Sequence, residues 1–200
     1  MVRDVYKFFL PLLAAGMVAA WMRRPYLSAL FFILAAFVCF FFRNPKRLIP
    51  EGNNLIVSPA DGKVVKISPI HGGEQAISIF LNIFSVHVNR SPIAGEVQQI
   101  EYKRGKFKAA FEDEASKVNE QNIITITGQG IRVVVRQIAG LIARRVVCWR
   151  KPGSRLQRGE LFGIIRFGSR VDIVLPEHVH ITVRVGDKVK GGSSIIGEYT

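Results

Sequence analysis

The sequence contains few of the residues that bind metals or form disulfides. Its 200 residues include two cysteines and four histidines. Cys39 lies in an apolar run and Cys148 in a strand-like run, so the sequence predicts neither a disulfide framework nor a cysteine cage for a metal. This cysteine content fits a reducing compartment, and we expect no metal centre.

Acidic residues are also scarce. The chain has 15 Asp and Glu against 28 Lys and Arg, a formal net charge of +13. Such an excess predicts an anionic partner, either acidic lipid or nucleic acid. The basic residues show neither a recognition-helix pattern nor aromatic side chains interleaved for base stacking. We therefore expect an anionic membrane surface as the partner and no nucleic acid.

Two uncharged apolar runs lie near the N-terminus. They span residues 8–22 and 26–42, and Arg23, Arg24 and Pro25 separate them. Each run is a little shorter than the ~20 residues that cross a bilayer comfortably, which predicts a tilted or partly inserted helical membrane hairpin over residues 1–47. A cleaved signal peptide is not favoured, because no small-residue cleavage site follows the first run.

The basic residues around these runs predict an orientation. Five of them gather at the open end of the expected hairpin, and only Arg23 and Arg24 lie at its turn. The positive-inside bias then places the rest of the chain on the cytoplasmic side of the inner cell membrane.

Residues 48–200 change to short β-rich pieces separated by Gly and Pro. This pattern predicts one compact, mainly β domain, built as a sandwich or a barrel. The polar stretch 106–120 is predicted to be a loop. The expected strands are 54–57, 62–67, 75–81, 95–102, 123–127, 132–138, 144–149, 161–167, 171–175 and 180–185.

Three Gly-Ser dipeptides are candidates for chemistry on the backbone itself. In a strained Gly-Ser bond the hydroxyl attacks the preceding carbonyl, and elimination from the resulting ester leads to a terminal pyruvoyl group. Gly153-Ser154 lies in a polar turn, and Gly192-Ser193 lies close to the C-terminus. Gly168-Ser169 is expected in a turn between two apolar strands, whose rigid flanks favour it. An ordinary turn is the simpler interpretation of any one of these dipeptides.

Five segments together resemble a known family. They are FRNPKR after the apolar runs, SPADGKV, FLNIFSVHVNRSPIAGEV, RLQRGELFGIIRFGSRVDIVLP and VRVGDKVKGGSSIIGE. In content, order and spacing the chain resembles the short form of phosphatidylserine decarboxylase, including its archaetidylserine decarboxylase-like members, over essentially its whole length. The resemblance implies self-cleavage between Gly168 and Ser169 into a β-chain, 1–168, and an α-chain, 169–200, which form a heterodimer. Ser169 would become the covalently bound pyruvoyl cofactor.

The resemblance also implies roles for single residues. Asp61, His87 and Ser169 match the family's processing triad, in which His87 would take the hydroxyl proton of Ser169 and Asp61 would orient the imidazole. His87 is also expected to return a proton during decarboxylation. Arg90 and Arg170, each close in sequence to a triad residue, are candidates for binding the lipid phosphate. Without the resemblance, Asp61 would be interpreted as a turn residue and His87 as a core histidine.

The activity implied by the resemblance is the decarboxylation of a serine phospholipid. Phosphatidylserine, or a similar lipid, would lose CO2 through a Schiff base with the pyruvoyl group and give phosphatidylethanolamine, a step of phospholipid biosynthesis. The sequence leaves open whether the lipid chains are ester- or ether-linked. It also leaves open a higher oligomer.

Single features of the sequence suggest two alternative functions. His178 and His180 form an H-x-H pair, as in zinc peptidases of the lysostaphin kind, but His71 is followed by Gln75 where a carboxylate ligand is needed. The segment VRVGDKVKGGSSIIGE resembles hairpins of non-enzymatic biotinyl and lipoyl carrier domains. No lysine here has the flanking residues of such a carrier, so that likeness reflects β architecture alone.

Overall fold

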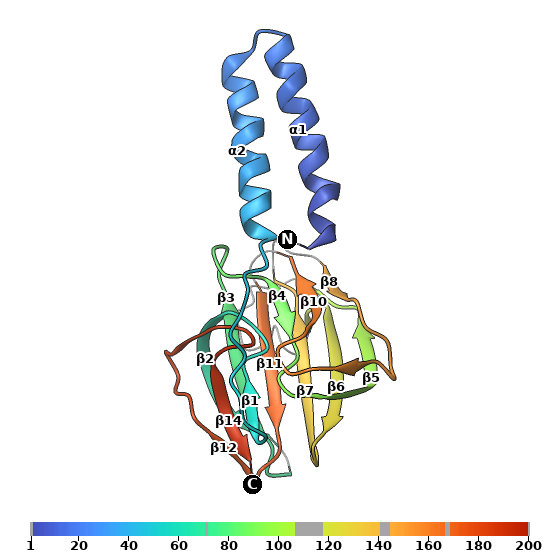
Figure 1. The fold of residues 1–200 in the computed structure, drawn as a ribbon, viewed down its shortest axis with the longest axis vertical. Helices are drawn as coiled ribbons and strands as arrows, with labels where there is room; N and C mark the ends of the chain where they lie inside the picture. The colour runs from blue at the N-terminus through green and yellow to red at the C-terminus, as the bar shows by residue number, and fades with distance from the viewer. Residues whose placement is uncertain (1, 71, 107–117, 141–144, 167–168, 200) are drawn as a thin grey trace. The chain divides into compact units, whose positions relative to one another are not determined.

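The computed structural model describes residues 2–70, 72–106, 118–140, 145–166 and 169–199 (Figure 1). The chain divides into two compact units, Met1–Lys46 and Arg47–Thr200. The expected role of the first unit as a membrane anchor stays a prediction.

The first unit is a helical hairpin. A short 3-10 helix, η1 (Arg3–Val5), leads into α1 (Tyr6–Trp21), and α2 (Pro25–Phe41) returns antiparallel to it (Figure 1). Pro25 occupies the first turn of α2, where its missing N–H costs no hydrogen bond. Arg23, at φ 54°, reverses the chain between the helices. Both helices coincide closely with the two apolar runs.

Small residues let the two helices approach each other. The Ser28 hydroxyl donates to the Gly16 carbonyl at 2.9 Å, and a Cβ at Gly16 would lie 3.0 Å from the Phe32 ring. Apolar side chains also point away from this contact, since Met17, Val18 and Ile33 are all more than half exposed. Within the described part of the chain, no helix has both the length and the apolar character needed to cross a membrane.

The second unit is built from β-strands in three sheets. An eight-stranded sheet has the order β13-β2-β3-β11-β7-β6-β5-β9, and two three-stranded sheets have the orders β1-β14-β12 and β4-β10-β8. The strands are β1 (Leu55–Val57), β2 (Gly62–Pro69), β3 (Gln75–Leu81), β4 (Val88–Arg90), β5 (Gly95–Lys103), β6 (Gln121–Gly128), β7 (Ile131–Ile138), β8 (Val146–Cys148), β9 (Arg155–Leu156), β10 (Leu161–Ile165), β11 (Ser169–Leu175), β12 (Val179–Ile181), β13 (Lys188–Val189) and β14 (Ile195–Tyr199).

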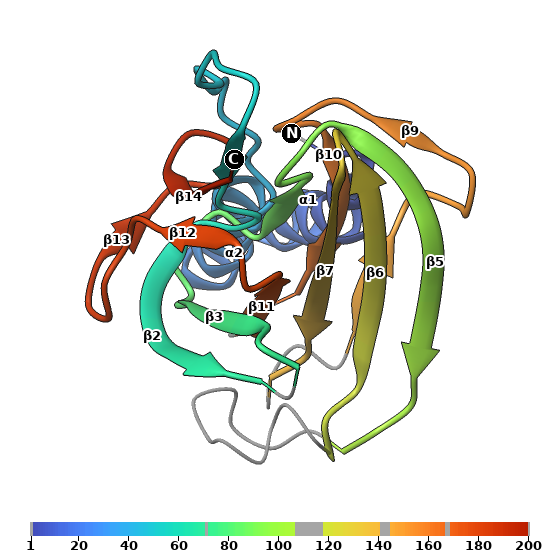
Figure 2. The ribbon, with the colours of Figure 1, turned by 90° about the horizontal axis from the view of Figure 1, so that it is seen from below.

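The large sheet is strongly curled, as Figure 2 shows for the strands from β2 to β5. It ends at two edges, β13 and β9, so it forms a half-barrel and does not close on itself. The prediction of a mainly β unit is confirmed. The expected sandwich or barrel takes the form of this curled sheet accompanied by the two smaller sheets.

One face of the curled sheet carries the core. Side chains alternate between the two faces along each strand, so Val171, Ile173 and Leu175 of β11 lie on one face, and all three are fully buried. They belong to a single apolar cluster that includes Ile56 of β1 and Phe162 of β10. The smaller sheets thus supply part of the same core. The opposite face of the curled sheet carries polar and charged residues.

The sequence located the long strands better than the short ones. The strand expected at 75–81 is β3, with the same bounds, and the one expected at 132–138 is β7 with one additional residue. The strands β4, β9, β13 and β14 were not expected, because they are short or contain glycine. The strand expected at 180–185 ends at Ile181. Most of the predicted loop at 106–120 lies outside the described residues.

Candidate functional site

Ser169 is the first residue of β11 and pairs with Leu81 of β3. The expectation that it lies in a turn is therefore wrong, because the sheet register already includes it. Its side chain is 0% exposed, and among the residues described, its Oγ makes no hydrogen bond. Gly168, the other half of the predicted cleavage site, lies outside the described residues.

The strands on either side of this position belong to different sheets. β10 pairs with β4 and β8, whereas β11 pairs with β3 and β7. The chain therefore leaves one sheet at Ile165 and enters another at Ser169. Ser169 is the first of seven positions of β11 that pair with β3, so its backbone is held in the register of the sheet.

His87 lies immediately before β4 and is 0% exposed. Its carbonyl accepts a hydrogen bond from the Ile165 N–H at 3.2 Å, so its backbone is held beside the end of β10, four residues before Ser169. The imidazole Nδ1 lies 2.9 Å from the Ser85 carbonyl. A carbonyl only accepts hydrogen bonds, so this contact assigns a proton to Nδ1 and makes Nε2 the nitrogen that takes up a proton.

Asp61 lies in the turn between β1 and β2. One of its oxygens, Oδ1, accepts a hydrogen bond from the Gly191 N–H at 2.8 Å. The Arg47 Nη2 lies 2.9 Å from Oδ1 and 2.7 Å from Oδ2. The hydrogen bonds described for Asp61 thus lead to Arg47 and Gly191, while His87 is oriented by Ser85. The expected contact between Asp61 and His87 stays a prediction.

Arg90 lies beside Asp61 and Arg47. Its Nη1 donates to the Gly159 carbonyl at 2.8 Å. Burial lowers the pKa of the Arg90 guanidinium, the charge of Arg47 lowers it further, and the charge of Asp61 acts in the opposite direction. The three side chains form a partly buried cluster with two positive charges and one negative charge. Such an excess favours an anion as ligand.

Arg170 has a different environment from Arg90. It is 5% exposed, and its Nε lies 2.6 Å from Asp172 Oδ1. Its Nη2 contacts Ser78 Oγ at 2.7 Å and Asp172 Oδ2 at 3.2 Å. These bonds fasten the beginning of β11 to β3. The buried pairing favours a structural role for Arg170 and not the predicted contact with a lipid phosphate.

A chain of buried amides was not anticipated from the sequence. Asn122 Nδ2 donates to Gln137 Oε1 at 3.0 Å, and Gln137 Nε2 donates to Asn89 Oδ1 at 2.7 Å. Gln137 pairs in register with Val171, two residues beyond Ser169. The Asn89 Nδ2 is buried, and among the described residues it has no hydrogen-bond partner.

This unpaired amide points to a function. Leaving a buried donor unsatisfied costs about 1–3 kcal/mol, so native proteins rarely retain one without a use. The signal in the sequence was a run of polar residues inside apolar strands, such as Asn89 two positions after His87. Ser169, His87, Asn89 and Gln137 are all 0% exposed. They give the interior of this unit several polar groups suited to acid-base and hydrogen-bonding chemistry.

Two of the three histidines of the zinc alternative lie among the described residues. His178 and His180 are both exposed on and beside β12, and His71 lies outside the described residues. In the part of the chain that the structure describes, no three His, Cys, Asp or Glu side chains are grouped so that they would hold a metal ion.

Comparison with known proteins gives one family. Residues 34–197 match the family model for phosphatidylserine decarboxylase. A phosphatidylserine decarboxylase proenzyme of Solibacter usitatus is 49% identical over 189 residues, 94% of this chain and 92% of the relative. A proenzyme of the same name from Syntrophus aciditrophicus is 46% identical over 186 residues, 90% of this chain and 87% of the relative. Another, from Symbiobacterium thermophilum, is 44% identical over 202 residues, 98% of this chain and 94% of the relative. The chain therefore belongs to the phosphatidylserine decarboxylase family.

Proposed function

We propose that this chain is a proenzyme that cuts itself between Gly168 and Ser169 and then decarboxylates the serine headgroup of a phospholipid. The observation that carries the proposal is the Ser169 hydroxyl, which is buried, held in register by β11 and without a described hydrogen-bond partner. The relatives of this chain are named phosphatidylserine decarboxylase proenzymes, and this name supports both the proposed cleavage and the proposed substrate.

The cleavage needs only groups of the chain and water. The Ser169 Oγ attacks the Gly168 carbonyl carbon while its proton passes to His87, and the C–N bond breaks as that nitrogen takes up a proton, leaving an ester. Removal of the Ser169 Hα breaks the Cβ–Oγ bond, so that Gly168 leaves as a carboxylate and a dehydroalanine remains. The dehydroalanine, an enamine, tautomerises to the imine, which takes up water and releases ammonia and so leaves a pyruvoyl group at the new N-terminus.

The α-chain must stay in place after the backbone is cut. β11 lies between β3 and β7 and pairs with both along most of its length. The buried ion pair between Arg170 and Asp172, together with the bond from Arg170 to Ser78, fixes the residues next to the new terminus. These contacts hold position 169 with the precision that a reacting group requires.

The surroundings of position 169 fit the formation of a pyruvoyl group, because the buried Ser169 Oγ makes no described hydrogen bond and is the atom that leaves with Gly168, while the ketone forms at Cα. Such a group supplies an electron sink for the loss of CO2 from an amino acid. We assign the proton return to His87, because its Nδ1 donates to the Ser85 carbonyl and leaves Nε2 as the nitrogen that takes up and returns a proton. We assign to Asn89 Nδ2, the unpaired buried donor, a hydrogen bond to the headgroup of the lipid.

The lipid phosphate is assigned to the cluster of Arg47, Asp61 and Arg90. This cluster has two positively charged guanidinium groups and one carboxylate, so it carries a net positive charge, and Arg90 is only partly buried. Guanidinium groups bind phosphate with paired hydrogen bonds, so Arg90 is the better candidate of the two arginines predicted from sequence.

We further propose that the hairpin attaches the enzyme to the inner membrane, with the β unit on the cytoplasmic side. Helices of 16 and 17 residues extend about 24–26 Å, a little less than the roughly 30 Å hydrocarbon core, which fits partial insertion. The apolar outward side chains of α1 and α2 support a lipid environment, because a helix that is apolar all round is stable only when covered.

Intact mass spectrometry of the purified chain tests the proposal. We expect two fragments that divide after residue 168, a pyruvoyl group on the smaller fragment, and release of CO2 from phosphatidylserine in mixed micelles. Treatment with borohydride should abolish the CO2 release, because it reduces the ketone. A full-length, uncut chain that releases CO2 would contradict the mechanism, and a cut chain without this activity would contradict the substrate.

A further inference from the structure

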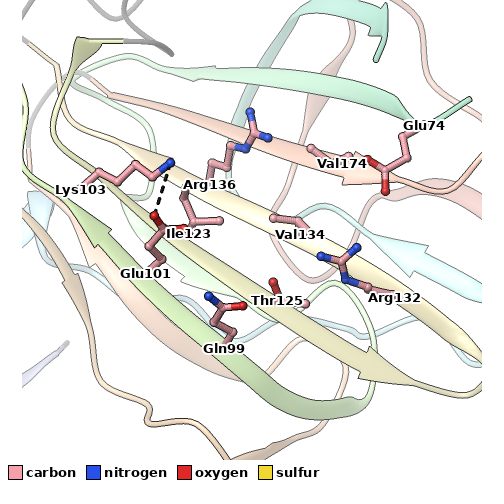
Figure 3. Close-up of a pocket in the computed structure, with 10 residues that line it drawn as sticks. All are labelled: Glu74, Gln99, Glu101, Lys103, Ile123, Thr125, Arg132, Val134, Arg136 and Val174. Atoms are coloured by element: carbon pink, nitrogen blue, oxygen red, sulfur yellow. Dashed lines mark ion pairs between the residues drawn. The ribbon is translucent and has the colours of Figure 1, made fainter. Parts of the chain in front are cut away.

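A cavity lies on the face of the curled sheet opposite the core. It has a volume of about 270 Å³ and is lined by outward side chains of β5, β6, β7 and β11 together with Glu74 (Figure 3). Val174 of β11 lines this cavity, and side chains alternate along a strand. Ser169 therefore lies on the other face of the same strand, and the cavity is separate from the candidate active site.

Two arginines of β7 and Lys103 of β5 provide the positive charge of this cavity. Arg132 and Arg136 flank Val134 on the same face of the strand (Figure 3). Arg132 is exposed and Arg136 is half-buried. The Nε of Arg136 is buried and, in the part of the chain described, has no hydrogen-bond partner.

The missing partner of Arg136 has a structural cause. Asp172 lies directly opposite Arg136 in the register of β7 and β11. Its carboxylate, however, is bound to Arg170 at 2.6 and 3.2 Å. The buried carboxylate opposite Arg136 is thus engaged by Arg170, and the Nε of Arg136 keeps no hydrogen-bond partner among the described residues.

The other polar groups limit what the cavity accepts. Lys103 is paired with Glu101 at 3.4 Å, and Glu74 contributes a further carboxylate (Figure 3). These carboxylates repel an extended polyanion such as nucleic acid. Thr125 adds a hydroxyl, which donates to or accepts from a ligand oxygen. The cavity therefore suits a small ligand with one concentrated negative charge.

We propose that this cavity is an anion site that binds a phosphate group through Arg136, with Arg132 as a second contact. Arginine presents donors that match two oxygens of a phosphate, and such charge-assisted bonds are stronger than those between neutral groups. The phosphate comes either from a free phosphate compound or from a lipid headgroup, since both present the same chemistry to the two arginines. The site is independent of the proposed decarboxylation.

Calorimetric titration of inorganic phosphate into the full-length protein in detergent tests the site. We expect saturable binding that weakens about tenfold in Arg136→Gln, because a charge-assisted hydrogen bond is lost. Arg132→Gln should weaken it less. Arg155→Gln, which removes the same charge from an exposed position on β9, should leave it unchanged. The absence of saturable binding, or equal weakening by Arg136→Gln and Arg155→Gln, would overturn the proposal.

Two further measurements keep the result interpretable. Phosphate should raise the unfolding temperature of the unmodified protein, since a ligand stabilises the state that binds it. If Arg136→Gln does not unfold cooperatively, Arg136→Lys is used in its place. Lysine keeps the positive charge but lacks the paired N–H donors of arginine, so this variant should still bind phosphate more weakly.

Co-sedimentation with phosphatidylglycerol vesicles distinguishes the source of the phosphate. Reduced sedimentation of Arg132→Gln identifies a lipid headgroup, and unchanged sedimentation identifies a free phosphate compound. Vesicle binding without any binding of inorganic phosphate would refute the small-anion site.

Discussion

Arg47 holds the carboxylate of Asp61, with Nη2 at 2.9 Å from Oδ1 and 2.7 Å from Oδ2. Both side chains are largely buried, 11% and 16% exposed. Arg47 is the first residue of the second unit, and Asp61 belongs to the turn that the resemblance identifies with processing. The segment that begins the β unit is therefore fastened to a candidate catalytic turn.

Breaking this pair should destabilise the β unit. In a Ser169→Ala background, which keeps the chain uncut, Arg47→Ala should lower the free energy of unfolding by about 1–3 kcal/mol, because the partly buried Asp61 loses a charged partner. Urea denaturation measures the change. Asp61→Asn combined with Arg47→Ala should cost less than the sum of the single changes, and strict additivity would contradict the coupling. Arg155→Ala, at an exposed position, is the control.

Ser169→Ala should abolish self-cleavage without destabilising the fold. The Ser169 Oγ makes no described hydrogen bond, so its removal leaves no partner unsatisfied. Mass spectrometry should show a single chain of 22.4 kDa. The other Gly-Ser dipeptides supply matched controls: Ser154→Ala and Ser193→Ala should still give two fragments. Cleavage that persists in Ser169→Ala would place the reacting serine elsewhere.

His87→Gln should slow self-cleavage by about 10²–10⁴-fold, the usual contribution of a positioned general base. The rate is measured by following fragment formation in freshly translated protein. His180→Gln, which changes an exposed histidine, should leave the rate unaltered. An unchanged rate in His87→Gln would remove His87 from the proposed proton transfer.

Asp172→Asn should be among the most damaging changes in the curled sheet. It leaves the buried Arg170 guanidinium without a negative partner, and breaking a buried pair from one side costs about 3–5 kcal/mol. Urea denaturation in the Ser169→Ala background gives this value. Glu177→Gln removes a carboxylate at an exposed position and should have little effect. A loss below about 1 kcal/mol, the range of surface pairs, would show that Arg170 finds another partner.

The outward face of the hairpin should govern vesicle binding. Ile33→Glu places a charge at a position of α2 that is 66% exposed, and a charge in an apolar lipid environment should reduce vesicle flotation about tenfold or more. Val185→Glu, at a position 59% exposed in the β unit, is the matched control. Self-cleavage should be normal in both variants. Equal flotation of Ile33→Glu and the unmodified protein would argue against an anchoring role.

The sequence by itself determined the features that depend on neighbouring residues. Uncharged apolar runs give α1 and α2, and alternation of apolar side chains gives β3 and β7 almost to the residue. The choice among the three Gly-Ser dipeptides rested on family motifs, because composition and spacing left an ordinary turn as the simpler interpretation of each. Short strands such as β4 and β13 carry too few residues for a pattern to identify them.

Only the tertiary structure decided which side chains meet. Asp61 contacts Gly191 across 130 positions of sequence, and Arg170 contacts Ser78 across 92. Such pairs depend on how distant strands come into register, which no local pattern encodes. The same register places Ser169 inside β11 and leaves Arg136 without its opposite carboxylate. Arg90 and Arg170 thus looked equivalent in sequence but differ in the fold. Arg90 is a partly exposed cation, whereas Arg170 is buried in an ion pair with Asp172.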